Sequence, residues 1–233
     1  MVKTLSLVVL IFGKDKVFSQ DCCVADQFSI GLAKSVHWIF NSSRSHLTRV
    51  RGHAAMDYTG HRYALNYIGE DFGEKRSWKT SIIKLYNKHT LYMIVDDTRC
   101  FKHSLRGKEP QQCVPEGAHL DDSIFFGKRS LPVNSWKMIV HHHESYYGDL
   151  RFATTQTNCI PVAFSLMARL QRKSGNYDHH VQDGVFFNFT TGVEPSFFTV
   201  PDICKHPIQK LKRNTEEWFG IFFGEELFFL NSF

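Results

Sequence analysis

The chain has 233 residues, of which 42% are hydrophobic and 22% charged, and a formal net charge of +5 at pH 7. This composition excludes a disordered chain and a multi-span membrane protein, and the length suits one domain with a sizeable core. The mild, dispersed charge gives no argument for nucleic acid and permits weak attraction to anionic lipids or glycans. The 21 phenylalanines exceed what a β-sandwich core needs, which suggests a lined cavity or an apolar contact surface.

Residues 1–19 have the features of a secretory signal peptide. A positive charge at Lys3 precedes the apolar run 5–12, which is too short to span a bilayer. The residues before Gln20 favour cleavage at that point, and cleavage after Gly13 is the alternative. A secreted chain folds in an oxidising compartment, so its cysteines are expected to pair.

Residues 20–204 are predicted to be one mainly β domain, because apolar and polar residues alternate along most of this region. No helical period persists before residue 205, and no repeat is present. The polar region 101–120, which contains Pro110 and Pro115, is predicted to be a loop. Strands are predicted over residues 28–40, 48–58, 62–68, 79–86, 90–95, 131–143, 150–155 and 160–170, with hairpins around the turns at 58–60 and 87–89.

Residues 205–233 are predicted to be a C-terminal extension. Apolar residues at helical spacings favour a short helix over 208–219. The strongly apolar run 218–233 is predicted to be an extra strand or a flap over the domain. The alternative is a lipidation tail that is removed, which Glu225 and Glu226 disfavour.

The stretch 183–204 predicts a strand followed by a turn that a disulfide at Cys204 holds in place. Asn188 begins an N-glycosylation acceptor and must face water, as must a second acceptor, Asn41, in a polar loop. Because side chains alternate across a strand, Phe186 is predicted to lie on the same solvent-exposed face as Asn188. The side chains predicted to point into the interior are Val185, Phe187 and Phe189. A plain core strand with an unused acceptor is the alternative.

An even number of cysteines in a secreted chain supports a framework of three disulfides, although six cysteines allow 15 pairings. Zinc is disfavoured because the chain has no Cys-x-x-Cys pair and Cys22 and Cys23 are adjacent. The six residues are Cys22, Cys23, Cys100, Cys113, Cys159 and Cys204.

No catalytic motif is found: the chain lacks Gly-x-Ser-x-Gly, His-Glu-x-x-His, a phosphate-binding glycine loop and an EF-hand loop. The chain is therefore predicted not to be an enzyme. On a strand, His141 and His143 would share a face and could bind a transition metal with His179 or His180. Because no carboxylate stands at a defined spacing, a solvated strand end is the favoured interpretation.

The segment from Asn188 to Cys204 resembles the C-terminal signature of the ependymins and ependymin-related proteins. The residues that match this signature are Gly192, Val193, Pro195, Ser196, Phe198, Pro201 and Cys204. Glu194 stands where the family has an aspartate. Residues 159–162, Cys-Ile-Pro-Val, resemble a second family segment, and the resemblance extends over roughly residues 22–204.

This resemblance implies two stacked, curved antiparallel sheets that enclose an apolar pocket, as in bacterial lipoprotein-carrier domains. It implies that Cys22 or Cys23 pairs with Cys159 and that Cys100 pairs with Cys204, which leaves Cys113 for the remaining N-terminal cysteine. Calcium also belongs to the family's description. Its oxygen ligands could come from Asp96, Asp97, Asp121, Asp122 or Glu194.

The leading hypothesis is a secreted glycoprotein that binds a lipid or fatty acyl chain in that pocket by hydrophobic burial. The candidate lining residues are Phe187, Phe189, Phe164, Leu166, Val140 and Met138. The alternative is a calcium-dependent adhesion protein that contacts the extracellular matrix and holds no small ligand. The expected location is extracellular, with the lysosome as a second site, and the expected partners include a second copy but no nucleic acid.

Overall fold

The computed structural model describes residues 22–40, 44–105, 108–128, 130–142, 146–171 and 177–208. These residues form eleven strands and three short 3-10 helices. The strands are β1 (Gln27–Phe40), β2 (Arg44–Asp57), β3 (Arg62–Asp71), β4 (Arg76–Leu85), β5 (Thr90–Val95), β6 (Arg99–Ser104), β7 (His119–Phe126), β8 (Leu131–His142), β9 (Tyr146–Thr155), β10 (Pro161–Gln171) and β11 (Tyr177–Thr191). The 3-10 helices are η1 (Tyr86–Lys88), η2 (Pro195–Phe198) and η3 (Asp202–Lys205).

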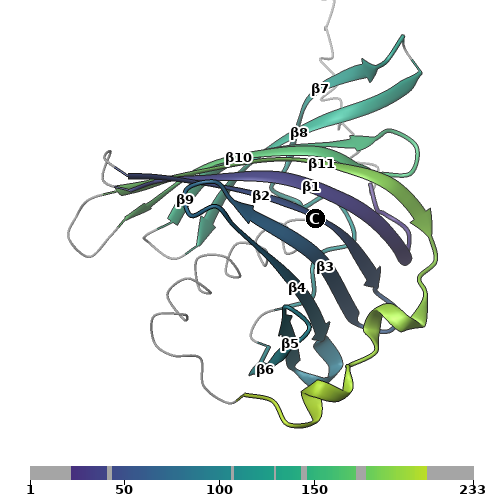
Figure 1. The fold of residues 1–233 in the computed structure, drawn as a ribbon. Helices are drawn as coiled ribbons and strands as arrows, with labels where there is room; N and C mark the ends of the chain where they lie inside the picture. The colour runs from purple at the N-terminus through teal and green to yellow at the C-terminus, as the bar shows by residue number, and fades with distance from the viewer. Residues whose placement is uncertain are drawn as a thin grey trace, which may run out of the picture.

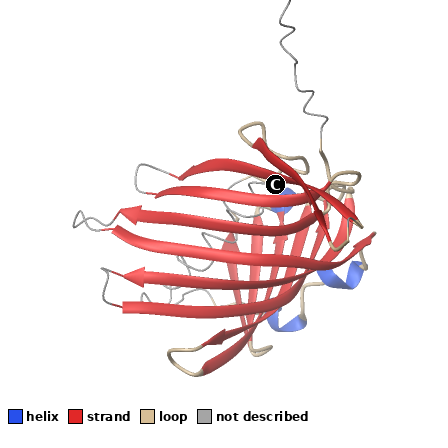
Figure 2. Ribbon diagram, turned by 90° about the horizontal axis from the view of Figure 1, so that it is seen from above, coloured by secondary structure: helices blue, strands red, loops and turns tan. Residues whose placement is uncertain are grey.

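All eleven strands belong to one antiparallel sheet in the order β6-β5-β4-β3-β2-β1-β11-β10-β9-β8-β7. The chain runs outward from β1 to β6 at one edge. It then crosses to β7 at the other edge and returns through β8, β9 and β10 to β11, which pairs with β1. Figure 1 shows that the sheet is strongly curved, and Figure 2 shows its strands (red) side by side from above.

The mainly β class and the curved antiparallel strands agree with the sequence prediction. The two stacked sheets expected from the family resemblance are instead two halves of one continuous sheet. The halves are joined because β1 and β11 pair along most of their length, from Phe28 opposite Thr191 to Ile39 opposite His179. Strong twist and curvature allow a single large sheet to enclose an interior.

The main core lies on the concave face of the sheet. Along β1 the even-numbered residues Phe28, Ile30, Val36 and Trp38 are buried, as the alternation of a strand requires. Two clusters of buried residues share this face. One contains Met56, Tyr63, Leu65 and Ile82 of β2–β4 with the start of β1, and the other contains Trp136, Leu150, Phe152, Phe164 and Leu166 of β8–β10.

A third cluster covers the opposite face of β2–β6. Ala55, Ala64 and Ile83 lie side by side on adjacent strands, and Phe198 of η2 packs over them. The guanidinium of Arg62 lies 4.4 Å from the centre of the Phe198 ring. The C-terminal segment that contains η2 and η3 therefore closes this part of the sheet (Figure 1).

Three disulfides join Cys22 to Cys159, Cys23 to Cys113, and Cys100 to Cys204. This confirms the three-bridge framework and the pairing implied by the family resemblance, and it assigns Cys22 rather than Cys23 to Cys159.

Several predictions concern residues outside the described ones. These are the signal peptide at 1–19, the acceptor Asn41, His143 and the helix and apolar run within 209–233. Ile208, the first residue of the predicted helix, instead forms a parallel bridge with Phe101 of β6. In the described part of the chain, no helix has the length and apolar character needed to cross a membrane.

Candidate ligand pocket

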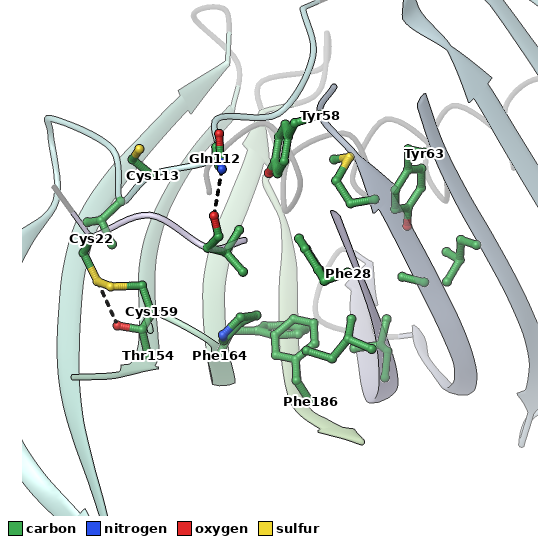
Figure 3. Close-up of a pocket in the computed structure, with 18 of the residues that line it drawn as sticks. Cys22, Phe28, Tyr58, Tyr63, Gln112, Cys113, Thr154, Cys159, Phe164 and Phe186 are labelled. Atoms are coloured by element: carbon green, nitrogen blue, oxygen red, sulfur yellow. Dashed lines mark hydrogen bonds between the residues drawn. A yellow bond between two sulfur atoms is a disulfide. The ribbon is translucent and has the colours of Figure 1, made fainter. Parts of the chain in front are cut away.

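A pocket opens on the concave face of the sheet, next to the two N-terminal disulfides (Figure 3). Its space amounts to about 890 Å³, which includes the opening to solvent. The lining residues are Cys22, Val24, Phe28, Ile30, Leu32, Lys34, Ala54, Met56, Tyr58, Tyr63, Leu65, Gln112, Cys113, Val114, Thr154, Cys159, Pro161, Phe164 and Phe186.

The floor of the pocket is built by cross-strand neighbours on β1, β2 and β3. Ile30 lies opposite Ala54, and Ala54 lies opposite Leu65 on the other side. Cross-strand neighbours share a face of the sheet, so all three side chains point into the concave side. Because Ala54 has only a methyl group between two larger side chains, space remains there.

An aromatic wall comes from β10 and β11. The rings of Phe164 and Phe186 lie 5.6 Å apart between centroids, and both line the pocket. Phe164 is paired across the strands with Gly184, and its ring lies over that glycine. A side chain at position 184 would occupy the space that the ring takes.

The disulfides hold the remaining wall, which consists of the segments 22–24 and 112–114. The backbone N–H of Val24 donates to the carbonyl of Gln112 at 3.1 Å, and the side-chain amide of Gln112 donates to the Val24 carbonyl at 2.8 Å. Figure 3 shows the hydrogen bond from the Gln112 side chain beside the Cys22–Cys159 disulfide. Two short segments far apart in sequence are thus clamped together at the pocket.

Three polar groups of the lining already have hydrogen-bond partners in the protein. The Thr154 hydroxyl accepts from the indole N–H of Trp136 at 2.9 Å, and Gln112 is engaged with Val24. The Tyr58 hydroxyl donates to the Gln111 carbonyl at 3.2 Å. Burial, with a smaller contribution from the nearby carboxylate of Glu109, raises the pKa of Tyr58 well above its usual value. The wall therefore presents a mainly apolar surface.

The structure corrects the predicted orientation of the 183–204 strand. Phe186, predicted to face water, lines the pocket, whereas Phe187 and Val185 are exposed on the other face at 40% and 52%. Phe189 does point inward, as predicted, and stacks on Phe28 at 5.4 Å. A β-bulge causes the change, because Asn188 and Phe189 together oppose Ile30 of β1.

Of the six predicted lining residues, Phe164 lines the pocket. Leu166, Val140 and Met138 lie in the adjacent core cluster of β8–β10, and Phe189 packs against the cluster at the start of β1. Phe187 faces away. The sequence reasoning missed the lining residues of β1–β3, although the alternation of Phe28, Ile30 and Leu32 carried a signal for the first strand.

The candidate calcium ligands lie in separate places. Asp96 and Asp97 stand in the turn between β5 and β6, where Asp97 pairs with Lys79 at 2.6 Å. Asp121 and Asp122 belong to β7 at the opposite edge of the sheet, and Glu194 precedes η2. Within the described residues, no three His, Cys, Asp or Glu side chains form a group that could hold a metal ion. Calcium binding stays a prediction, and no residue is assigned to it.

The candidate transition-metal histidines are also apart. His141 is on β8 and His179 on β11, with β9 and β10 between them, a spacing of roughly 14 Å. His180 is buried, with its ring 4.1 Å from that of Trp38 and the side-chain amide of Gln182 donating to its Nε2. Burial, together with the charge of Lys34, lowers the pKa of His180 to about 3.

One curved antiparallel sheet, cross-linked by disulfides and with an apolar pocket open on its concave face, defines the class: a β-sheet protein with an apolar pocket. The family model of Ependymin matches residues 74–204, which is more than half of the chain, so the chain belongs to the ependymin family.

No curated protein matches this chain. Among solved structures, a LolA superfamily protein from Nitrosomonas europaea is 11% identical and covers 76% of this chain and 91% of its own, with a TM-score of 0.31. MucB, solved in complex with MucA(peri), is 8% identical and covers 72% and 94%, with a TM-score of 0.11. Similarities with such TM-scores support no argument about this protein.

Proposed function

We propose that this ependymin-family protein is secreted and binds a hydrophobic ligand, a lipid or fatty acyl chain, in the concave pocket without chemical reaction. One observation carries the proposal. The pocket wall is mainly apolar, and the polar groups of Thr154, Gln112 and Tyr58 are already paired within the protein. Such a wall favours burial of hydrocarbon.

The driving force would be removal of hydrocarbon from water. Each buried CH₂ group contributes about 0.8 kcal/mol, so six of them contribute roughly 5 kcal/mol before the entropy of association is subtracted. With few polar contacts to fix orientation, the protein would accept acyl chains of related length rather than one compound. The polar end of the ligand would remain at the opening, in water.

Two further observations support the location. Three disulfides and no free cysteine among the described residues fit an oxidising compartment. The acceptor Asn188 is exposed and does not line the pocket. Glycosylation at this residue would leave the pocket free.

The test is native mass spectrometry of protein secreted by cultured cells, together with titration of a delipidated sample with a fluorescent fatty acid. Ala54→Leu would fill the space between Ile30 and Leu65, and we expect it to lower affinity at least tenfold. The matched control is Ala33→Leu, on the opposite face of β1, which should bind like wild type.

The melting temperature separates pocket filling from misfolding. Because Ala54→Leu adds apolar atoms to free space, the delipidated variant should melt no lower than delipidated wild type. Wild-type protein that carries no lipid and binds no fatty acid would overturn the proposal. So would an Ala54→Leu variant that is folded and binds as well as wild type.

A further inference from the structure

The hairpin of β7 and β8 leaves the edge of the sheet and ends in an apolar tip, which we name the hairpin tip and define as residues 124–128, 130 and 131. Figure 1 shows the hairpin extending beyond the neighbouring strands. All eight residues of β7 are exposed. Phe125 and Phe126 are adjacent and exposed at 55% and 42%, and Ile124 and Leu131 are exposed as well.

The hairpin tip is apolar on both faces. Phe126 lies opposite Leu131 and shares a face with Ile124, whereas Phe125 lies opposite Pro132 on the other face. A protein partner docking on a sheet face would cover one of these faces and leave the other in water. A medium that surrounds the tip would cover both, and the hydrocarbon–headgroup boundary of a bilayer is such a medium.

Ser130 of the turn has hydrogen-bond partners inside the tip. The backbone N–H of Ser130 donates to the carbonyl of Gly127 at 2.6 Å, and the Ser130 hydroxyl donates to the same carbonyl at 2.9 Å. This hydroxyl also lies 3.3 Å from the Phe126 carbonyl. Backbone groups that are satisfied internally lower the cost of leaving water.

The charge of the tip suits an anionic surface. Lys128 is exposed in the turn, and the sequence places Arg129 next to it. The first acidic side chain toward the body, Asp122, is four residues before Phe126, roughly 13 Å along the strand. Ser123 and Asn134 form a hydrogen-bonded pair at 2.9 Å between the two regions and mark a polar boundary. Insertion to a depth of 5–10 Å would therefore bury the aromatic residues and keep Asp122 in water. Lys128 lies in the turn beyond Phe126 and Leu131, so its long side chain would have to reach back to the headgroups.

We propose that the hairpin tip inserts into the outer layer of lipid bilayers that contain anionic lipids, through Phe125 and Phe126, with Lys128 at the headgroups. This interaction surface is distinct from the concave pocket. The hairpin tip lies close to the pocket in sequence, since segment 112–114 of the pocket wall precedes β7 by a few residues.

The test is co-sedimentation of the full protein with vesicles of phosphatidylcholine, with and without phosphatidylserine. Phe125→Ser/Phe126→Ser should weaken binding about a hundredfold, because each buried phenyl group contributes roughly a factor of ten. Lys128→Ala should weaken binding to anionic vesicles about fivefold and leave binding to neutral vesicles unchanged. The matched control, Ile68→Ser/Phe72→Ser, removes two equally exposed apolar side chains near the β3–β4 turn and should bind like wild type.

A second measurement does not depend on the double variant. In Phe125→Trp, the new indole should be quenched by vesicles of brominated phosphatidylcholine mixed with phosphatidylserine, beyond the quenching of wild type. Ala54→Leu should still bind vesicles, so failure of the pocket proposal would be distinguishable from failure of this one.

Three results would overturn the inference. Wild type that does not sediment with either vesicle is the first, and an unquenched tryptophan at position 125 is the second. The third is a dimer of the wild type, seen by sedimentation velocity, that Phe125→Ser/Phe126→Ser converts to a monomer, while the wild type binds no vesicle. That result would assign the tip to contact between two copies of the chain.

Discussion

Two glycines of the central strands are each covered by a phenyl ring, and the pair gives a sharp test of how the pocket wall is built. A Cβ atom at Gly184 would lie 2.5 Å from Cζ of Phe164, and one at Gly31 would lie 2.5 Å from Cδ2 of Phe187. The local geometry is alike. The rings differ in freedom, because Phe164 is 5% exposed in the core whereas Phe187 is on the outer face.

We expect Gly184→Ala to destabilise the protein and Gly31→Ala to be nearly neutral. Overpacking a buried site costs about 1–3 kcal/mol, and replacing a strand glycine by alanine returns about 0.5–1 kcal/mol. The net loss for Gly184→Ala therefore lies between about 0 and 2.5 kcal/mol, with a central value of roughly 1 kcal/mol. In Gly31→Ala, the exposed ring of Phe187 can turn into solvent, so stability should stay within about 0.5 kcal/mol of wild type.

Urea unfolding of the two variants measures this difference. Gly184→Ala should also weaken fatty-acid binding, since the Phe164 ring can move only toward the pocket. In a Phe164→Leu background the cost of Gly184→Ala should nearly vanish, because the smaller side chain leaves the Cβ atom room. If both alanine variants had wild-type stability, or if Gly31→Ala were the more damaging, this account of the wall would be wrong.

Three further predictions concern stability. Burial alone would raise the pKa of Asp57, but hydrogen bonds from the Gly60 N–H, Arg62 and Gln27 lower it below its usual value. Asp57→Asn should therefore lower the free energy of unfolding, measured with urea at pH 7, by about 1.5–3 kcal/mol. This loss should shrink at acidic pH, where Asp57 of the wild type becomes protonated. His180 stays neutral in the native protein down to about pH 3, whereas the same side chain in the unfolded protein is protonated below about pH 6.5. The free energy of unfolding should therefore fall by about 2 kcal/mol from pH 7 to pH 5. An equal fall in His180→Gln would refute this prediction. Cys23→Ser/Cys113→Ser opens a loop with a sequence separation of 90 and should lower the free energy of unfolding by about 2–4 kcal/mol, whereas an unchanged value would show that the other two bridges suffice.

Alternation along the chain was sufficient to predict most strands and both early hairpins. The β2–β3 and β4–β5 hairpins form around the two predicted turns. The strands β6 and β7 were not predicted. In β6, the residues Lys102, His103 and Ser104 are polar and exposed and therefore resemble a loop. At the edge of a sheet, pairing on one side through the backbone suffices, and side-chain pattern carries little information.

The composition correctly indicated more phenylalanine than a solid core needs, but not where the excess lies. Part of it forms the pocket wall with Phe164 and Phe186, and part lies on the hairpin tip with Phe125 and Phe126. Exposure depends on which strand becomes the edge of the sheet. That is a property of the strand order, which brings β7 to one end and cannot be derived from the local pattern of residues 119–126.

The face of β11 was mispredicted because strict alternation fails at one residue, and this failure makes the pocket wall possible. Asn188 has φ = 50°, in the left-handed region that asparagine tolerates better than most residues. Without the bulge, the even-numbered face that carries Phe186 would continue to Asn188 and point a polar, sugar-accepting side chain into the interior. With the bulge, Asn188 turns to solvent while Phe186 and Phe189 both reach the concave side. One extra residue thus allows a glycosylation acceptor to stand between two aromatic residues of the interior.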